Sequence, residues 1–279
     1  MTAVRPFAGR AGAPAGMSIV IGTPDSFSDG GEFSDPVRAI AHGRALIEAG
    51  ADILDIGGES TRPGATELSP EAEAGRVLPV IAGLARAGVP LSIDTRHAAV
   101  MAAALDAGAA IVNDVTALTH DPEALALVAR RQSPVILMHM QGTPETMQDG
   151  PRYDDVVVEV LDFLAARVRA CETVGIDRAR IAIDPGIGFG KSLAHNLTLL
   201  AHLDRFRALG CAVMVGASRK SFIARASGGE AVDNRLGGSL AAALFAANRG
   251  VDLVRVHDVA ETRQALAVWQ AIGKARSSA

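Results

Sequence analysis

Eight short apolar segments recur along the chain, and they constrain its fold more than any other feature. Each consists largely of Val, Ile, Leu and Ala, and successive segments begin roughly 33 residues apart. They span 18–21, 52–56, 91–93, 110–112, 135–138, 180–183, 212–215 and 252–256. Continuous apolar runs of this length are typical of strands buried on both faces, as in parallel sheets.

Helix signals lie between these segments. Pro36 follows Ser34 and Asp35 and opens a stretch that ends at Gly50, and Ser69 precedes a run of acids that suits the first turn of another helix. The predicted helices cover 36–49, begin at 69 and at 121, and cover 154–173, 235–248 and 260–272. Strands therefore alternate with helices along the chain.

This alternation predicts right-handed β-α-β units, which build either a doubly wound sheet or an eight-stranded barrel. Eight units within 279 residues match the usual length of the barrel. The predicted fold class is α/β, a single (β/α)8 TIM barrel over residues 17–273. Residues 1–16 are predicted to form a flexible N-terminal arm rather than a transit peptide, and 274–279 a C-terminal tail.

Composition excludes several classes of protein. The net charge of −4 argues against a surface built for nucleic acid, and 49% apolar with 21% charged residues indicates a globular chain. No apolar run approaches the roughly 18 residues that a membrane span needs. Cys171 and Cys211 match no metal spacing, which predicts a reducing, cytoplasmic location.

Polar residues stand at or near the carboxyl ends of the predicted strands. In a barrel these ends converge on the face that carries the active site. The residues are Asp25, Asp55, Asp94, Asn113, Asp114, His139, Asp184, Ser218, Arg219, Lys220, Arg255 and His257. Single members allow a second interpretation, because Asp94 and Asp184 also suit turns and His139 also suits a buried core position. Their coincidence on one face predicts a functional site.

Two loops and two excluded motifs narrow the chemistry. The loops 23–31 and 57–64, after the first and second strands, are rich in Gly, Ser and Asp and are predicted to be mobile lids. The segment 185–192 has Pro185 where a phosphate loop needs its first glycine. The segment 216–220 lacks the last glycine of a nucleophile elbow, which argues against a serine hydrolase.

Eight motifs, in order and at matching spacing over roughly residues 17–272, resemble the dihydropteroate synthase family. They are Thr23-Pro24-Asp25-Ser26-Phe27-Ser28-Asp29-Gly30-Gly31, Gly57-Gly58-Glu59-Ser60-Thr61-Arg62-Pro63-Gly64, Ser92-Ile93-Asp94-Thr95, Asn113-Asp114, Met138-His139-Met140-Gln141-Gly142, Asp184-Pro185-Gly186-Ile187-Gly188-Phe189-Gly190-Lys191, Ser218-Arg219-Lys220-Ser221 and Arg255-Val256-His257-Asp258. The resemblance implies a transferase of folate biosynthesis. Its reaction joins 6-hydroxymethyl-7,8-dihydropterin pyrophosphate to 4-aminobenzoate and yields 7,8-dihydropteroate and pyrophosphate.

The resemblance also implies roles for individual residues. Asp184 and Asn113 would bind the pterin edge, Lys220 the acceptors of the ring, and Asp94 its far side, where it would stabilise a pterin cation. Phe189 and Met138 would form apolar walls. Arg255 and His257 would bind the pyrophosphate, and Thr61, Arg62 and Ser221 the aminobenzoate or the phosphates. Gly216 and Val256 complete the binding residues; Asp94, Lys220, Arg255 and His257 are the expected catalytic residues.

Charge at this predicted site differs from the chain average. Arg62, Arg219, Lys220, Arg255 and His257 are expected to form a cationic cluster. Lysine is scarce elsewhere, since the other lysines are Lys191 and Lys274. Lys220 should stay charged beside two carboxylates, because their fields oppose its desolvation.

One position departs from the family pattern. The family places a Mg²⁺-binding asparagine where this chain has Ile21, and an isoleucine offers no ligand to a hard cation. The sequence therefore assigns no metal ligand, and Mg²⁺ would arrive with the pyrophosphate. Two alternatives stay open: a pterin-binding paralogue with weak or no synthase activity, and a pterin-dependent methyltransferase. The family further implies a homodimer paired through outer helices such as 239–247, and inhibition by sulfonamides, which mimic aminobenzoate.

Overall fold

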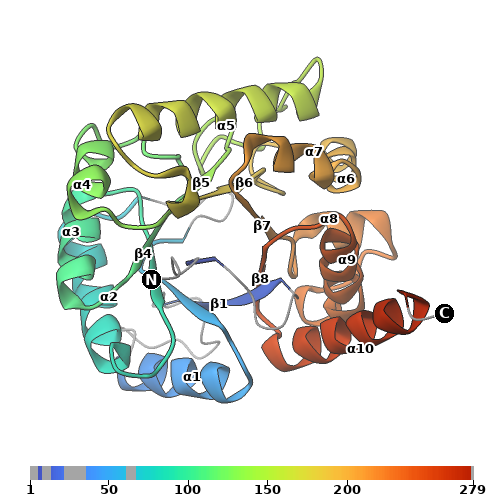
Figure 1. Ribbon diagram of the computed structural model, residues 1–279, viewed down its shortest axis with the longest axis horizontal. Coiled ribbons are helices and arrows are strands. Elements are labelled where there is room, and N and C mark those ends of the chain that lie inside the picture. The colour runs from blue at the N-terminus through green and yellow to red at the C-terminus, as the bar shows by residue number, and fades with distance from the viewer. Residues whose placement is uncertain (1–5, 8–13, 22–35, 61–66, 278–279) are drawn as a thin grey trace.

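The computed structural model describes residues 6–7, 14–21, 36–60 and 67–277, and shows a closed barrel of eight parallel strands (Figure 1). Each strand pairs with the next along the chain, and β8 closes the barrel by pairing with β1. The strands are β1 (Ala15–Ile21), β2 (Ile53–Gly57), β3 (Leu91–Asp94), β4 (Ile111–Asp114), β5 (Val135–Met138), β6 (Ile181–Asp184), β7 (Ala212–Gly216) and β8 (Leu253–Val256). The predicted (β/α)8 fold is confirmed.

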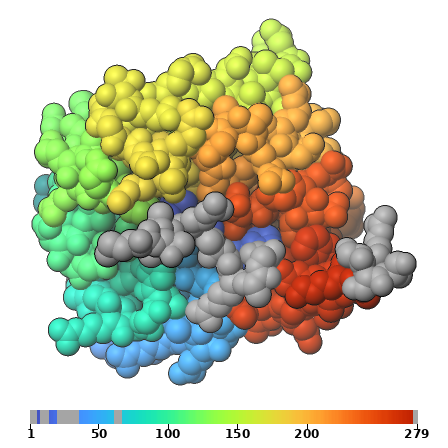
Figure 2. Space-filling model, viewed as in Figure 1, coloured from blue at the N-terminus to red at the C-terminus, as the bar shows by residue number. Residues whose placement is uncertain are grey.

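Helices surround the strands on the outside of the barrel (Figure 1). They are α1 (Pro36–Glu48), α2 (Pro70–Leu84), α3 (Ala98–Ala107), α4 (Ala124–Arg131), α5 (Val156–Thr173), α6 (Leu193–Ala201), α7 (Leu203–Phe206), α8 (Ser221–Ala226), α9 (Leu236–Asn248) and α10 (Val259–Ser277). In the space-filling view the colours follow the chain order around the rim, from blue and green through yellow to red (Figure 2). Successive units are therefore neighbours in space. Within the described part of the chain, no helix combines the length and apolarity that crossing a bilayer requires.

Local chemistry explains where the helices begin. The Ser69 hydroxyl accepts a hydrogen bond from the Ala72 amide at 3.2 Å and caps α2, as the sequence predicts. Asp121 behaves differently from its predicted role as the start of the next helix. Its carboxylate accepts from the Ala98 amide at 2.8 Å, at the first residue of α3, while α4 begins only at Ala124. The other oxygen of this carboxylate accepts from the Glu123 amide at 2.9 Å, directly before α4, so Asp121 contacts the starts of both helices.

The core has two layers. The larger layer lies between the strands and the helices, and the smaller one fills the inside of the barrel. The inner layer consists of Phe7, Ala15, Met17, Ile53, Ile111, Ile136, Ala182, Met214 and Leu253. Few aromatics are needed because Val, Leu, Ile and Ala occupy most of these positions.

The ends of the chain differ from the expected boundaries. Phe7 lies in the predicted flexible arm, yet it is only 3% exposed and belongs to the inner layer. A large apolar side chain gains free energy by leaving water, which accounts for its burial. The first strand begins at Ala15, and α10 continues beyond residue 273 to Ser277. The predicted lids 23–31 and 57–64 fall largely outside the described residues.

Candidate active site

The predicted site residues face the inside of the barrel because of the two-residue period of a strand. Side chains alternate between the two faces, so a residue two positions beyond an inner-layer residue points the same way. Six predicted residues stand at that distance from inner-layer residues: Asp55, Asn113, Met138, Asp184, Gly216 and Arg255. The register of neighbouring strands places several of the predicted site residues side by side. Asp94 pairs with Asn113, Met138 with Asp184, and Gly216 with Arg255.

Arg255 is the centre of the charged part of this site. Its Nε donates to Asp55 Oδ2 at 2.7 Å and its Nη2 to Asp94 Oδ2 at 2.8 Å. The Asn113 amide donates to the same Asp55 oxygen at 3.1 Å. Asp55 is fully buried, and its second oxygen, Oδ1, has no hydrogen-bond partner among the described residues. Four side chains from four different strands thus form one buried polar network.

Electrostatics in this network act on Asp94 in opposite directions. Burial and the neighbouring Asp55 carboxylate raise the pKa of Asp94, and the charge of Arg255 opposes that shift. Arg255 stays charged, since the surrounding carboxylates outweigh its desolvation and raise its pKa. Asp55 and Asp94 thus occupy the Nε and Nη2 atoms of the arginine that the sequence analysis expects to bind pyrophosphate.

Lys220 forms a second charged position, directly before α8. Its ammonium donates to the Ile187 carbonyl and lies 4.5 Å from the centroid of the Phe189 ring. Burial lowers the pKa of Lys220 to about 8, against the opposing charge of Asp184. The pKa of Lys220 is therefore lower than that of an exposed lysine, while the charge of Asp184 favours the protonated form that the sequence analysis expects. The Asp184 carboxylate accepts from the Gly186 amide at 2.7 Å.

Glycine is required in the loop between β6 and α6. Gly186 has φ +71°, in the left-handed region, and a Cβ there would stand 1.9 Å from the His139 carbonyl oxygen. No side chain fits at that distance. This close approach lets the loop turn back so that Phe189 and the Ile187 carbonyl meet Lys220.

Lys191 is a buried residue of this loop that sequence reasoning missed. It is 1% exposed, and its ammonium donates to the Phe189 carbonyl at 2.8 Å and lies 2.9 Å from His139 Nδ1. Burial lowers the pKa of Lys191 to about 7, and burial beside that ammonium lowers the pKa of His139 to about 3. His139 is thus a neutral core histidine. The sequence signal that could have identified Lys191 is the scarcity of lysine in this chain.

Replacing Lys191 by methionine is expected to reduce the rise of stability with pH. In the unfolded chain a lysine keeps its proton up to about pH 10.5, whereas folded Lys191 loses it near pH 7. Between these values the unfolded state binds more protons, so stability of the native protein rises with pH. Urea unfolding at pH 7 and pH 9 measures the increment, which Lys191→Met should lack. Lys274→Met, on the exposed face of α10, is the control; equal increments in the wild type and Lys191→Met would contradict the prediction.

The remaining predicted residues are dispersed. Arg219 was expected in the cationic cluster, but it pairs with an acid instead: its Nε donates to Asp258 at 3.1 Å. Val256 faces outward and packs in the core between strands and helices, since it neighbours the inward Arg255. Ser221 is exposed at the first residue of α8. His257 Nδ1 lies 3.0 Å from the Ser218 hydroxyl. Thr61 and Arg62 lie outside the described residues.

The chain is similar to known proteins in both sequence and fold. Residues 17–257 match the family described as pterin binding enzyme. The chain belongs to the pterin-binding enzyme family. It is 50% identical over 264 residues to a dihydropteroate synthase of Neisseria meningitidis serogroup C, with 93% of each chain covered. The predicted resemblance is confirmed, and with it the assignment to the transferases.

Solved structures in the family have the same fold. The dihydropteroate synthase of Xanthomonas albilineans with 4-aminobenzoic acid gives a TM-score of 0.88 at 54% identity, covering 94% of this chain and 93% of that one. The Yersinia pestis enzyme with a sulfonamide drug gives a TM-score of 0.89 at 43% identity, covering 94% and 95%. The barrel of this pterin-binding chain therefore matches enzymes whose structures contain those two ligands.

The magnesium position implied by the family does not fit this chain. Ile21 ends β1 and pairs in register with Gly57 of β2. Mg²⁺ takes oxygen ligands, and neither an isoleucine side chain nor a glycine supplies one. Ile21 and Gly57 therefore provide no side-chain ligand for Mg²⁺.

Proposed function

We propose that this chain catalyses the synthesis of 7,8-dihydropteroate from 6-hydroxymethyl-7,8-dihydropterin pyrophosphate and 4-aminobenzoate. The observation that carries the proposal is the buried network of Arg255, Asp55, Asp94 and Asn113 at the mouth of the barrel, with Lys220 beside it. A network of this kind offers donors and acceptors to a flat polar ring. The Phe189 and Met138 side chains supply the apolar surface that such a ring also needs.

The residue roles follow from the donor and acceptor inventory. Asp184 accepts from the amino and ring N–H groups of the pterin, and Lys220 keeps donors beyond its bond to Ile187, since an ammonium has three. Asn113 donates to Asp55 and keeps its carbonyl oxygen as an acceptor. Positive charge that develops on the pterin as its C–O bond breaks is stabilised by the carboxylates of Asp55 and Asp94.

The leaving pyrophosphate requires cations. Arg255 and His257 stand at the same strand end, and the arginine can exchange its bond to Asp94 for one to a phosphate. The amine of 4-aminobenzoate attacks unprotonated, so no covalent nucleophile or strong base is needed. Thr61, Arg62 and Ser221 are proposed to bind aminobenzoate or phosphate.

We propose that Mg²⁺, where the reaction uses it, enters with the pyrophosphate and is not held by β1. The test is steady-state release of pyrophosphate from the two substrates with Mg²⁺, for the wild type and Ile21→Asn side by side. Turnover by the wild type is expected. Pterin binding without turnover, restored by Ile21→Asn, would instead support the non-catalytic paralogue; absence of both binding and turnover would contradict the proposal.

The methyltransferase alternative is disfavoured by the arginine-centred network. A methyl transfer from a pterin releases no pyrophosphate, so it gives Arg255 and His257 no leaving group to stabilise. Incubation with a methylated pterin and a corrinoid acceptor should therefore give no methyl transfer. The 50% identity to a dihydropteroate synthase supports the same choice.

We further propose a homodimer in the cytoplasm that sulfonamides inhibit. The Ala-rich side of α9 packs inward, while Phe245 and Leu197 are exposed at 43% and 44% beside an apolar groove of about 560 Å³ between α6, α8 and α9. A second copy of the chain is the proposed occupant of this groove, so sedimentation should give a mass of twice 28.7 kDa.

Both free cysteines are buried, which suits the proposed location in a reducing compartment. Sulfonamides should compete with 4-aminobenzoate.

A further inference from the structure

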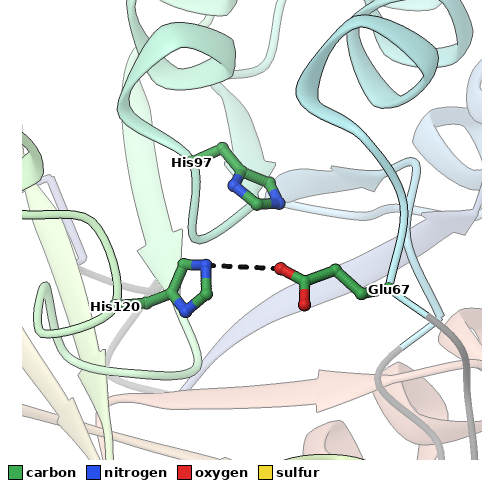
Figure 3. A group of neighbouring side chains, drawn as sticks. All are labelled: Glu67, His97 and His120. Atoms are coloured by element: carbon green, nitrogen blue, oxygen red, sulfur yellow. Dashed lines mark ion pairs between the residues drawn. The ribbon is translucent and has the colours of Figure 1, made fainter.

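A group of three potential metal ligands lies on the loops that follow β2, β3 and β4 (Figure 3). Glu67 comes shortly before α2, His97 directly before α3, and His120 between β4 and α4. One ligand atom from each side chain lies within 4.8 Å of those from the other two. The proposed synthase reaction uses none of them.

His97 is the member whose environment points to a ligand. It is only 7% exposed, and its Nε2 atom is buried without a hydrogen-bond partner among the residues that the structure describes. Leaving a buried polar atom unsatisfied costs free energy. The lone pair of a neutral imidazole nitrogen is also the commonest protein ligand for a metal. A bound ion would satisfy the atom.

The two histidines are held in place by a contact between their loops. Asp121, next to His120, accepts hydrogen bonds from the amides of Ala98 and Glu123 at 2.8 and 2.9 Å. Ala98 follows His97 directly, so this carboxylate joins the two histidine-bearing segments. The rings meet edge to face, with centroids 5.2 Å apart and planes at 78°. The pair is therefore pre-arranged before any ion binds.

Glu67 completes the set and is free to adjust. One of its oxygens lies 3.5 Å from His120 Nε2, and its side chain is 55% exposed. The same oxygen lies 3.2 Å from Arg96 Nη2. Arg96 has a stronger partner in Glu59, which it meets through Nε at 3.1 Å and Nη2 at 2.9 Å. An ion could thus take Glu67 without leaving the Arg96 charge unpaired.

We propose that Glu67, His97 and His120 form a site for a divalent transition-metal ion of the Zn²⁺ class. Two imidazoles and one carboxylate are a donor set that suits Zn²⁺ and leaves a position for water. Tetrahedral ligand atoms around zinc lie about 3.3–3.4 Å apart at Zn–N distances of 2.0–2.1 Å. The His120 and Glu67 side chains, which are the more exposed, would move inward to reach that spacing.

Calorimetric titration of the full chain with ZnCl₂, in buffer without phosphate or substrate, tests the site. One ion per chain is expected, and Co²⁺ should give the visible absorption of a cobalt–imidazole complex. Glu67→Gln and His120→Gln should each weaken Zn²⁺ binding by at least about 10-fold, the effect that even an outer-shell partner has. His97→Gln should do the same, and all three should lose the rise in Tm that zinc produces in the wild type.

The matched control is His202→Gln, because His202 lies at the other side of the barrel, where its Nδ1 contacts the Thr198 carbonyl at 2.8 Å. This variant should bind zinc as the wild type does. If His97→Gln does not fold, the two exposed positions still decide the question. The proposal fails if the wild type binds no ion in a 1:1 ratio, or if His202→Gln weakens binding as much as His120→Gln.

Discussion

Replacing Arg255 by methionine is expected to lower the free energy of unfolding by about 3–5 kcal/mol and kcat/KM by about 10²–10³-fold. The arginine is the cation that joins Asp55 and Asp94, at 2.7 and 2.8 Å. Asp55 is fully buried, so removing its partner leaves an uncompensated charge in the barrel. The loss of activity follows because the same guanidinium is the proposed donor to the leaving pyrophosphate.

Urea unfolding and pyrophosphate release measure the two effects of Arg255→Met separately. Arg263→Met is the matched control, because Arg263 on α10 also faces an aspartate, Asp52 at 3.8 Å, but is 42% exposed. Exposed pairs contribute about 0–1 kcal/mol, so this variant should unfold almost as the wild type does. The double variant Asp55→Asn/Arg255→Met should regain part of the stability but not the activity. Equal destabilisation by Arg255→Met and Arg263→Met would refute the buried network.

The sequence was sufficient to predict the barrel and the position of most site residues at the carboxyl ends of its strands. Both depend on short-range patterns. The apolar runs recur at regular spacing, and Asp184 stands two positions beyond the inner Ala182, so its direction follows from the pleat of β6. The family resemblance identified the same residues through their motifs. The strand end and the face on which a residue stands are thus determined largely by the local sequence.

Pairing between side chains was less predictable, because it depends on distances across the barrel. Arg255 was expected to be available to phosphate, yet strands far apart in the chain place Asp55 and Asp94 on two of its nitrogens. Arg219 stands next to Lys220 but turns toward Asp258. Lys191 follows three closely spaced glycines, a pattern that is typical of an exposed loop. Its burial requires the carbonyl groups of His139 and Phe189, which accept hydrogen bonds from its ammonium. No periodic pattern in the sequence indicates any of these contacts.

Replacing Lys220 by methionine is expected to weaken binding of 6-hydroxymethyl-7,8-dihydropterin pyrophosphate by about 10–100-fold. A hydrogen bond from a charged donor contributes about 1.5–3 kcal/mol, which corresponds to that change in Kd. The ammonium is placed for this role by the Ile187 carbonyl and by the Phe189 ring. Methionine preserves much of the side-chain volume and removes the charge, so the barrel should remain folded.

The pH dependence of pterin binding distinguishes the Lys220 charge from its packing. Burial lowers the pKa of Lys220 to about 8, so the donor is protonated below that pH and loses its proton above it. Wild-type affinity, measured by calorimetry, should therefore fall between pH 7 and pH 9 more steeply than the affinity of Lys220→Met. Titration of the ligand itself affects both proteins equally and cancels in the comparison. Lys274→Met should follow the wild type, whereas parallel profiles for the wild type and Lys220→Met would mean that Lys220 acts through packing alone.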